Sequence, residues 1–197
     1  MNEDNRAKIL QLAIDAIDGG GETAIRVNAI CAEAGVTPPV LYYHFGSRDG
    51  LVIAAHIERY SRRVAADLEE IRREVNRYQS AEELRETLRI VFPRILSERA
   101  ESRWRRVNVV GSAYARPEFE AAITRAQDEL IKGIVSIVEP CQQRGWLRPE
   151  IDLASVAAWQ HSLLFARVFV ERGNHNVDLA EWDRLTVDAI EQAYFGP

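Results

Sequence analysis

The side chains that could carry catalysis or hold a metal are few in this chain and widely spaced. None of its histidines has metal-ligand spacing to another histidine or to a cysteine. No Ser-His-acid arrangement and no phosphate-binding glycine loop occurs. We therefore expect that the protein is not an enzyme and that it uses no metal and no cofactor. The four histidines are His44, His56, His161 and His175.

A denser group of hydrogen-bonding side chains lies between residues 37 and 48. Tyr42, Tyr43 and His44 follow one another directly, and each joins an aromatic ring to a polar group. Such a run fits packing in a core as well as recognition at a surface. Which of the two applies depends on the elements that hold these residues.

Three short helices are predicted around this run. Apolar residues recur at helical spacing between residues 10 and 17, and three glycines then end that helix. The same spacing recurs at 27–34, followed by Gly35, which easily adopts the left-handed conformation beyond a helix end. Thr37 can cap a third helix, Pro38 suits its first turn, and Leu41 and Phe45 form its inner face.

The rest of the chain also has helical periodicity, and no strand pattern is present. Ser47 opens a long helix whose apolar stripe runs without a breaker to about residue 78. Ser80 and Glu83 form a capping-box pattern for the next helix, which Pro93 should kink or shorten. The remaining helices are expected at 104–114, from Pro117 to the breakers Pro140 and Gly145, and after the capping residues Asp152 and Asp178.

A short helix, a tight turn containing glycine and a second short helix form the helix-turn-helix arrangement, whose second helix enters the major groove of DNA. Three stretches here resemble the signature of the tetracycline-repressor (TetR) family. This resemblance implies an all-α fold with an N-terminal three-helix DNA-binding domain at 1–46. A long helix joins it to a C-terminal helical bundle for effector binding and dimerisation at 47–197. The stretches are Ile30-Cys-Ala-Glu-Ala-Gly-Val-Thr37, Val40-Leu-Tyr-Tyr-His-Phe45 and Ser47-Arg-Asp-Gly-Leu51.

The resemblance also implies which residues contact DNA. The hydroxyls of Thr37 and Tyr42 would bind backbone phosphates and set the register, and Arg48 would bind a further phosphate. Tyr43 would lie toward the DNA, whereas His44 fits a DNA contact and a structural hydrogen bond equally well. The complete predicted set is Arg26, Thr37, Pro38, Pro39, Val40, Tyr42, Tyr43, His44 and Arg48.

Two departures from the family pattern affect this prediction. Arg26 stands where the family often has a capping Thr or Ser, so the sequence does not establish a cap there, and a phosphate contact is the role expected for Arg26 instead. Two prolines replace the usual small or hydroxylated residues at the tip of the recognition helix. Pro39 and Val40 cannot donate a hydrogen bond, so we expect them to read bases by apolar contact, for example with thymine methyl groups.

By the same resemblance, the C-terminal domain binds a small-molecule effector of unknown identity, and the long helix transmits its binding to the DNA-binding domain. The candidate lining residues combine aromatic surface with a few polar groups. Ordinary core packing is the alternative for each of them. The candidates are Tyr60, Phe92, Trp104, Asn108, Ile123, Gln127, Trp159 and Leu163.

The last two helices are apolar on more than one face, which is more than a monomer's core requires. Leu164 and Val168 lie off the main stripe of the first of these helices, and Val187 and Ile190 lie off that of the second. The surplus favours a homodimer in which these helices pair with their copies as a four-helix bundle. A central helix surrounded by its own chain is the alternative.

Bulk composition places the protein among ordinary globular proteins. Hydrophobic residues make up 47% and charged residues 28%, the formal net charge is −5, and no secretory apolar segment or membrane-length apolar run is recognised. We therefore expect a cytoplasmic protein without membrane association. Cys31 and Cys141 both fall in helical patterns and are expected to be reduced packing residues.

The expected partner is double-stranded DNA that contains a palindromic operator. Most members of the family that the chain resembles are repressors, so we expect repression. Charge argues mildly the other way, because residues 1–50 carry four basic and seven acidic side chains. An acidic N-terminal region also suits a helical protein-interaction adaptor without specific DNA binding. If DNA is bound, few well-placed contacts doubled by dimerisation must suffice, with a modest salt dependence.

Overall fold

The computed structural model describes residues 3–98, 100–173 and 176–196, so that His175 lies outside the described residues. These residues form α-helices and one 3-10 helix, with no strand among them. The all-helical architecture expected from the sequence is confirmed. The elements are α1 (Glu3–Gly20), η1 (Glu22–Ala24), α2 (Val27–Ala34), α3 (Pro38–Phe45), α4 (Arg48–Val75), α5 (Ala81–Glu98), α6 (Ala100–Ala113), α7 (Pro117–Gln143), α8 (Leu153–Arg172) and α9 (Leu179–Phe195).

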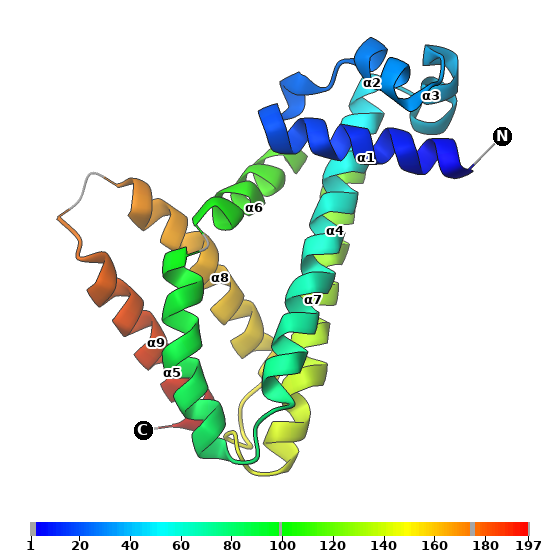
Figure 1. The fold of residues 1–197 in the computed structure, drawn as a ribbon. Coiled ribbons are helices and arrows are strands. Elements are labelled where there is room, and N and C mark those ends of the chain that lie inside the picture. Colours follow the sequence, from blue (N-terminus) through cyan, green and yellow to red (C-terminus); the bar gives the residue numbers. More distant parts are fainter. Residues whose placement is uncertain (1–2, 99, 174–175, 197) are drawn as a thin grey trace.

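The elements α1, η1, α2 and α3, which we call the head, gather at one end of the long helix α4 (Figure 1). Their core is entirely apolar, and Ile9, Leu41 and Leu51 are fully buried in it. Because Leu51 belongs to α4, the first turns of that helix pack as part of the head. The head is therefore attached to α4 through shared core packing.

The remaining elements, α4 to α9, form the body. Its longest helices, α4 and α7, lie side by side over most of their length (Figure 1). Gly133 allows this approach, because a Cβ atom there would lie 2.6 Å from both methyl carbons of Leu68. Side chains on the two helices thus interlock at a point where only a hydrogen atom fits.

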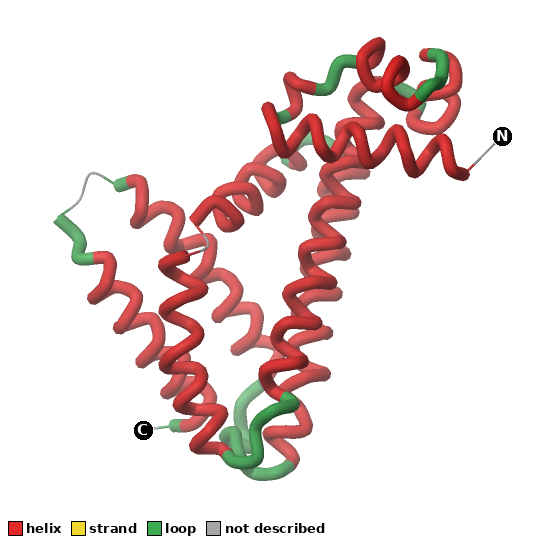
Figure 2. Tube along the Cα trace, viewed as in Figure 1, coloured by secondary structure: helices red, strands yellow, loops and turns green. Residues whose placement is uncertain are grey.

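The other body helices enclose a space beside α4 and α7. Helix α5 packs mainly on α9, and α8 contacts α6, α7 and α9. The loops that join α4 to α5 and α7 to α8 meet at the end of the molecule far from the head (Figure 2). Cys31 and Cys141 are both buried and free, in separate cores, as the sequence predicted.

Most helix ends follow the predicted signals. Gly35 has a φ of 73° beyond α2, and Ser47 accepts a hydrogen bond from the Gly50 amide at 2.9 Å. Asp152 and Asp178 cap α8 and α9 with their carboxylates. Thr37 occupies the capping position of α3, but its side chain makes no capping hydrogen bond.

The shortening expected at Pro93 and the helix end expected at Pro140 are not observed, whereas Gly145, the other expected breaker, has a φ of 75° just beyond the end of α7. Pro93 does not shorten α5, which runs through it to Glu98. Pro140 does not end α7, which continues to Gln143. A proline removes one backbone hydrogen bond, and tertiary packing along both helices outweighs that local loss.

Helix α8 is apolar on surfaces that face in opposite directions. Over 18 of its residues the mean hydropathy is 1.3, so by length and composition alone it could cross a membrane. However, Arg167 is buried within it and donates a hydrogen bond to Asp183 of α9 at 2.6 Å. The surplus apolarity instead lies on its outer face, where Phe169 is 71% exposed.

Candidate nucleic-acid interface and ligand cavity

Helix α3 presents aromatic side chains on the outer surface of the head. Leu41 is fully buried, whereas Tyr42 and Tyr43 are 44% and 68% exposed. The alternation follows from one helical turn, which points Leu41 inward and the two tyrosines outward. The core-packing interpretation, which the sequence left open for these tyrosines, therefore fails.

The other predicted DNA contacts surround these tyrosines to different degrees. Arg26, Thr37 and Pro39 are exposed, and they flank the beginnings of α2 and α3. Pro38 and Val40 are half-buried, so Val40 offers only part of its side chain to a partner. Hydroxyl, guanidinium and apolar groups are thus accessible around the beginnings of α2 and α3.

His44 packs between its aromatic neighbours. Its ring lies edge-on to the Tyr43 ring, with 5.2 Å between the centroids, and edge-on to the Phe45 ring at 6.2 Å. Its Nε2 atom is buried without a hydrogen-bond partner. This arrangement holds the ring in place and does not supply the structural hydrogen bond considered from the sequence.

Two basic side chains, Lys8 of α1 and Arg48 of α4, donate hydrogen bonds to backbone carbonyls of the head. Arg48 donates from Nε to the Ile25 carbonyl at 3.0 Å and from Nη2 to the Glu22 carbonyl at 2.5 Å. Lys8 donates to the carbonyl of Ala34 at 3.0 Å, at the end of α2. Arg48 therefore ties α4 to the turn before α2, in addition to any contact with phosphate.

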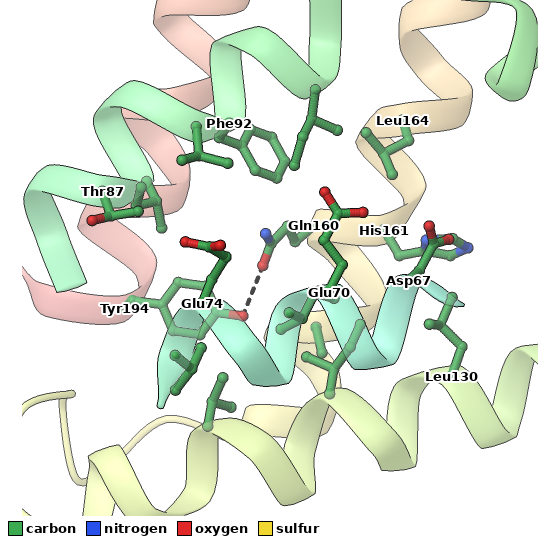
Figure 3. Close-up of a pocket in the computed structure, with 18 of the residues that line it drawn as sticks. Asp67, Glu70, Glu74, Thr87, Phe92, Leu130, Gln160, His161, Leu164 and Tyr194 are labelled. Atoms are coloured by element: carbon green, nitrogen blue, oxygen red, sulfur yellow. Dashed lines mark hydrogen bonds between the residues drawn. The ribbon is translucent and has the colours of Figure 1, made fainter. Parts of the chain in front are cut away.

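The body contains a partly open cavity of about 250 Å³ between α4, α5, α6, α7, α8 and α9 (Figure 3). Most of its wall is aliphatic or aromatic. Tyr194 donates a hydrogen bond to Gln160 Oε1 at 2.8 Å, which links α9 to α8 across one side (Figure 3). The apolar lining is Ile71, Val75, Leu84, Leu88, Val91, Phe92, Ile95, Leu130, Ile134, Val138, Leu147, Ala157, Leu164 and Phe195.

Among the eight candidate lining residues, Phe92 lines this cavity. Tyr60 and Ile123 are buried in the core between α4, α6 and α7, nearer the head. Trp104 lines a shallow hollow beside Arg172, whose guanidinium lies 4.6 Å from its ring centroid. Trp159 is 40% exposed. Asn108, Gln127 and Leu163 do not contribute to the cavity wall either.

The cavity wall also contains charged residues that the sequence-based candidates missed. Arg63 pairs with Asp67 at 2.7 Å, one turn further along α4, and Arg106 of α6 also bonds to Asp67. Arg103 of α6 bonds to Glu171 of α8 and donates to the Ile95 carbonyl at 3.0 Å. A usable signal was the spacing of Arg103 and Arg106, which places both on one face of α6.

His161 completes this polar end of the cavity. Burial, followed by the positive charge of Arg106, lowers the pKa of His161 to about 4, while Asp67 opposes the shift. The imidazole is therefore neutral at physiological pH. Its Nε2 atom has no hydrogen-bond partner, and its ring lies edge-on to Phe165 at a centroid separation of 5.1 Å.

Two acidic residues of the head connect it to the body. Asp18, near the end of α1, pairs with Arg59 of α4 at 2.8 Å and with Arg105 of α6. Glu22 accepts a hydrogen bond from His56 Nε2 at 3.0 Å. Burial and Arg59 lower the pKa of His56, so a neutral ring donates this bond.

Fold and surface together define a class of protein. It is a helix-turn-helix protein whose head is carried on a long helix of a separate helical body. Residues 9–55 match the family described as bacterial regulatory proteins, tetR family. Residues 9–55 of this chain thus form the N-terminal domain of the tetR family of bacterial regulatory proteins.

Solved structures with the same fold are available for comparison. A protein from Mesorhizobium loti described as a TetR-family transcriptional regulator is 18% identical, with 99% of this chain and 100% of that chain covered and a TM-score of 0.71. FadR of Thermus thermophilus, a TetR-family repressor in complex with lauroyl-CoA, is 18% identical (95% and 94% covered, TM-score 0.64). A protein from Saccharomonospora viridis described as a transcriptional regulator, in complex with choline, is 21% identical (98% and 98% covered, TM-score 0.63). A comparison with curated protein sequences gives no match.

Proposed function

We propose that the protein is a transcriptional repressor that binds a palindromic DNA operator as a homodimer and leaves it when a small molecule enters the cavity of the body. The observation that carries this proposal is the outward-facing side of α3. Tyr42 and Tyr43 are exposed there although their rings could have been buried in the head core. Exposed aromatic residues with hydroxyl groups suit contacts with phosphates and base edges.

Direct readout by α3 would be mostly apolar. Pro39 is exposed and Val40 half-exposed at the beginning of the helix, where a recognition helix meets the base edges. Neither side chain donates a hydrogen bond, so thymine methyl groups are their matching surface. Replacing operator thymines by uracil tests this point. Unchanged affinity at every position would contradict it.

A dimer would use the outer faces of α8 and α9. Phe169 of α8 and Leu185 of α9 are 71% and 55% exposed, and Trp159 adds a further aromatic ring. Large apolar side chains on two neighbouring helices are more than a monomer surface needs. Pairing these helices with their copies would cover them and place two recognition helices about one DNA turn, roughly 34 to 36 Å, apart.

The cavity supplies the place for an effector. Two structures with the same fold hold lauroyl-CoA and choline respectively, so this fold accepts small molecules of different chemistry. Here α6 lines the cavity with Arg103 and Arg106 and also carries Arg105, which pairs with Asp18 of the head. A ligand that prefers one position of α6 or α4 would thereby shift the head.

Selection of DNA fragments from a random duplex pool by the purified protein tests the proposal. We expect enrichment of a palindromic site. Tyr42→Phe, which removes only a hydroxyl, should weaken binding about tenfold, because a hydrogen bond to a charged phosphate oxygen is lost. Tyr114→Phe is the matched control, since Tyr114 is 84% exposed on the body and should not affect binding.

The adaptor alternative has one observation in its favour. Residues 1–50 are acidic overall, and two of their four basic side chains, Lys8 and Arg48, are engaged with backbone carbonyls. Recovery of no enriched site at any salt concentration would contradict the repressor proposal and favour an adaptor. Arg48→Ala is not a clean probe of phosphate contact, because it also frees the carbonyls that Arg48 holds.

A further inference from the structure

The charged side chains at the α6 end of the cavity are paired with one another or with a neighbouring helix. Arg63 and Arg106 both bond to Asp67. Arg103 bonds to Glu171 of α8. Removing one partner of such a pair would strand the other charge in partly buried surroundings. These groups are therefore stable as they stand and do not call for a charged guest.

The acidic residues further along α4 are engaged as well. Glu74 pairs at 2.9 Å with Arg77, which does not line the cavity, and Glu70 is not free of interactions either. The His161 imidazole is neutral. The described part of the wall thus contains three arginines and three carboxylates, which balance in formal charge. An ion would displace one of these partners or lie beside apolar surface without a counter-charge, so the wall favours an uncharged guest.

Gln160 of α8 offers this guest a hydrogen bond that the protein leaves unused. The Tyr194 hydroxyl donates to Gln160 Oε1 at 2.8 Å, and burial raises the pKa of Tyr194, so the hydroxyl keeps the proton that it donates. Figure 3 shows the amide between Tyr194 and Phe92, with its oxygen toward Tyr194 and its nitrogen on the Phe92 side. Among the described residues, Gln160 Nε2 has no hydrogen-bond acceptor.

The surface around this amide is mostly apolar. Aliphatic and aromatic side chains from α5 and α7 make up much of the wall, with Leu164 beside Gln160 on α8 itself. A few polar groups in an apolar cavity fix the orientation of a guest, because an unpaired polar group there is costly. The amide nitrogen only donates hydrogen bonds, so its matching partner is an acceptor such as a carbonyl oxygen.

We propose that the cavity binds an uncharged molecule with an apolar body and a carbonyl oxygen that accepts a hydrogen bond from Gln160 Nε2. This inference rests on the proposed function, because it names the chemical class of the effector. The volume of about 250 Å³ exceeds the roughly 150 Å³ that holds benzene and is below the usual range for drug-sized ligands. A single ring with a short side chain is of suitable size.

Calorimetric titration of the whole protein with acetophenone and three relatives of similar size tests the proposal. Ethylbenzene has a methylene group in place of the carbonyl, whereas benzoate and 1-phenylethylammonium carry a negative and a positive charge. We expect acetophenone to bind at least about tenfold more tightly than either ion, because neither ion finds a free counter-charge. Gln160→Leu should weaken acetophenone binding about tenfold without weakening ethylbenzene binding, because only the carbonyl loses a hydrogen bond.

Two further variants sharpen this test. Ser162→Ala is the matched control, because Ser162 is exposed on the same helix, bonds to the Trp159 carbonyl and does not line the cavity. Tyr194→Phe removes the hydroxyl that orients the amide and keeps the ring. It should weaken acetophenone binding less than Gln160→Leu does and leave ethylbenzene binding unchanged. Thermal unfolding of each variant establishes that the fold is retained.

Several outcomes would overturn the inference. These are tighter binding of either ion than of acetophenone, an equal effect of Gln160→Leu on acetophenone and ethylbenzene, and failure of all four compounds to bind. DNA is absent from these titrations, so their result is independent of operator binding. A protein that selects an operator without Gln160-dependent binding of acetophenone would refute only this inference. A protein that binds acetophenone through Gln160 but selects no operator would refute only the repressor proposal.

Discussion

The head and the body bury different kinds of side chain. The core of the head, together with the first turns of α4, consists entirely of apolar residues. The body buries the charged residues Arg103, Arg106, Arg167, Asp183 and Glu191. Arg167 pairs with Asp183, and Glu191 pairs with Arg85 and Arg89. An apolar core packs in one way at low cost, whereas buried ion pairs are stable only while each partner stays in place. The head is thus built as a rigid unit, and the body depends on the positions of charges.

The largest effect should come from breaking a buried ion pair of the body. Arg167→Met leaves Asp183 buried without its partner and should lower the free energy of unfolding by about 3 to 5 kcal/mol. Replacing Asp183 by Leu in the same protein should restore most of the loss. Urea unfolding at fixed protein concentration measures both. Arg184→Met, which removes exposed pairs on the same helix as Asp183, should have little effect on the free energy of unfolding. If Arg167→Met and Arg184→Met lowered the free energy of unfolding equally, the buried ion pair would stabilise the body no more than exposed pairs do. The contrast with the apolar core of the head would then be lost.

Close packing of the head should make the protein sensitive to substitution of Gly50, in the first turn of α4. A Cβ atom on Gly50 would lie 2.0 Å from the carbonyl oxygen of Phe45, so α3 and α4 would have to separate. Gly50→Ala should therefore destabilise the protein by about 3 kcal/mol. Gly111→Ala in α6 meets no neighbouring atom and should be neutral or stabilise by up to about 1 kcal/mol. Thermal unfolding distinguishes them, and a tolerated Gly50→Ala would contradict close packing of the head.

The body, unlike the head core, should also respond to pH through His161. Its pKa is lowered to about 4 in the folded protein, against about 6.5 when unfolded. Between these values the unfolded chain binds a proton that the folded protein does not, so stability falls as pH falls. We expect a loss of about 2 kcal/mol from this group between pH 7.5 and pH 5.

His161→Gln should abolish that part of the pH dependence. Unfolding free energies of both proteins at pH 7.5 and pH 5 give the comparison directly. An equal loss in the two proteins would show that His161 is not held neutral. His56, whose pKa is also lowered, remains in both and cancels in the difference.

The smallest effect concerns the contact between head and body. Asp18→Asn weakens the pairs with Arg59 and Arg105, which are partly exposed, and should change the unfolding free energy by less than about 1 kcal/mol. Hydrogen exchange in the last turn of α1 should nevertheless accelerate. Asp15→Asn is the control, because Asp15 bonds only within α1, to Gln11. Identical exchange in both variants would mean that these pairs do not hold the head in place.

The sequence predicts the head far better than the cavity. Helical spacing and Gly35 place α2 and α3 at the observed residues, because both helices are short and end at local signals. The lining of a cavity has no such signal. An apolar stripe shows which face of a helix points inward, but a core and a cavity present the same stripe. Phe92 and Tyr60 therefore looked equivalent, although Phe92 lines the cavity and Tyr60 lies in a closed core.

The prediction for Arg48 shows a related limit. A guanidinium at the beginning of α4 fits a phosphate contact, and that expectation still awaits a test. The sequence does not reveal the carbonyls of Glu22 and Ile25, which come close only after the head has folded. Glu70 and Glu74 were not among the predicted lining residues. Acidic residues on a long helix usually face solvent, and only the arrangement of α5 and α9 places these two at a cavity.

The close contact of Gly133 with Leu68 makes α4 a lever with its fulcrum beside α7. The methyl groups of Leu68 sit against the glycine, so sliding of α4 along α7 would displace them more than a tilt about this contact would. Arg48, at the head end of α4, lies 20 residues away, about 30 Å along the helix axis. A tilt of about 5° would carry that end by about 2.6 Å. Under the proposed function, a small displacement beside the cavity would thus be magnified before it reached the head.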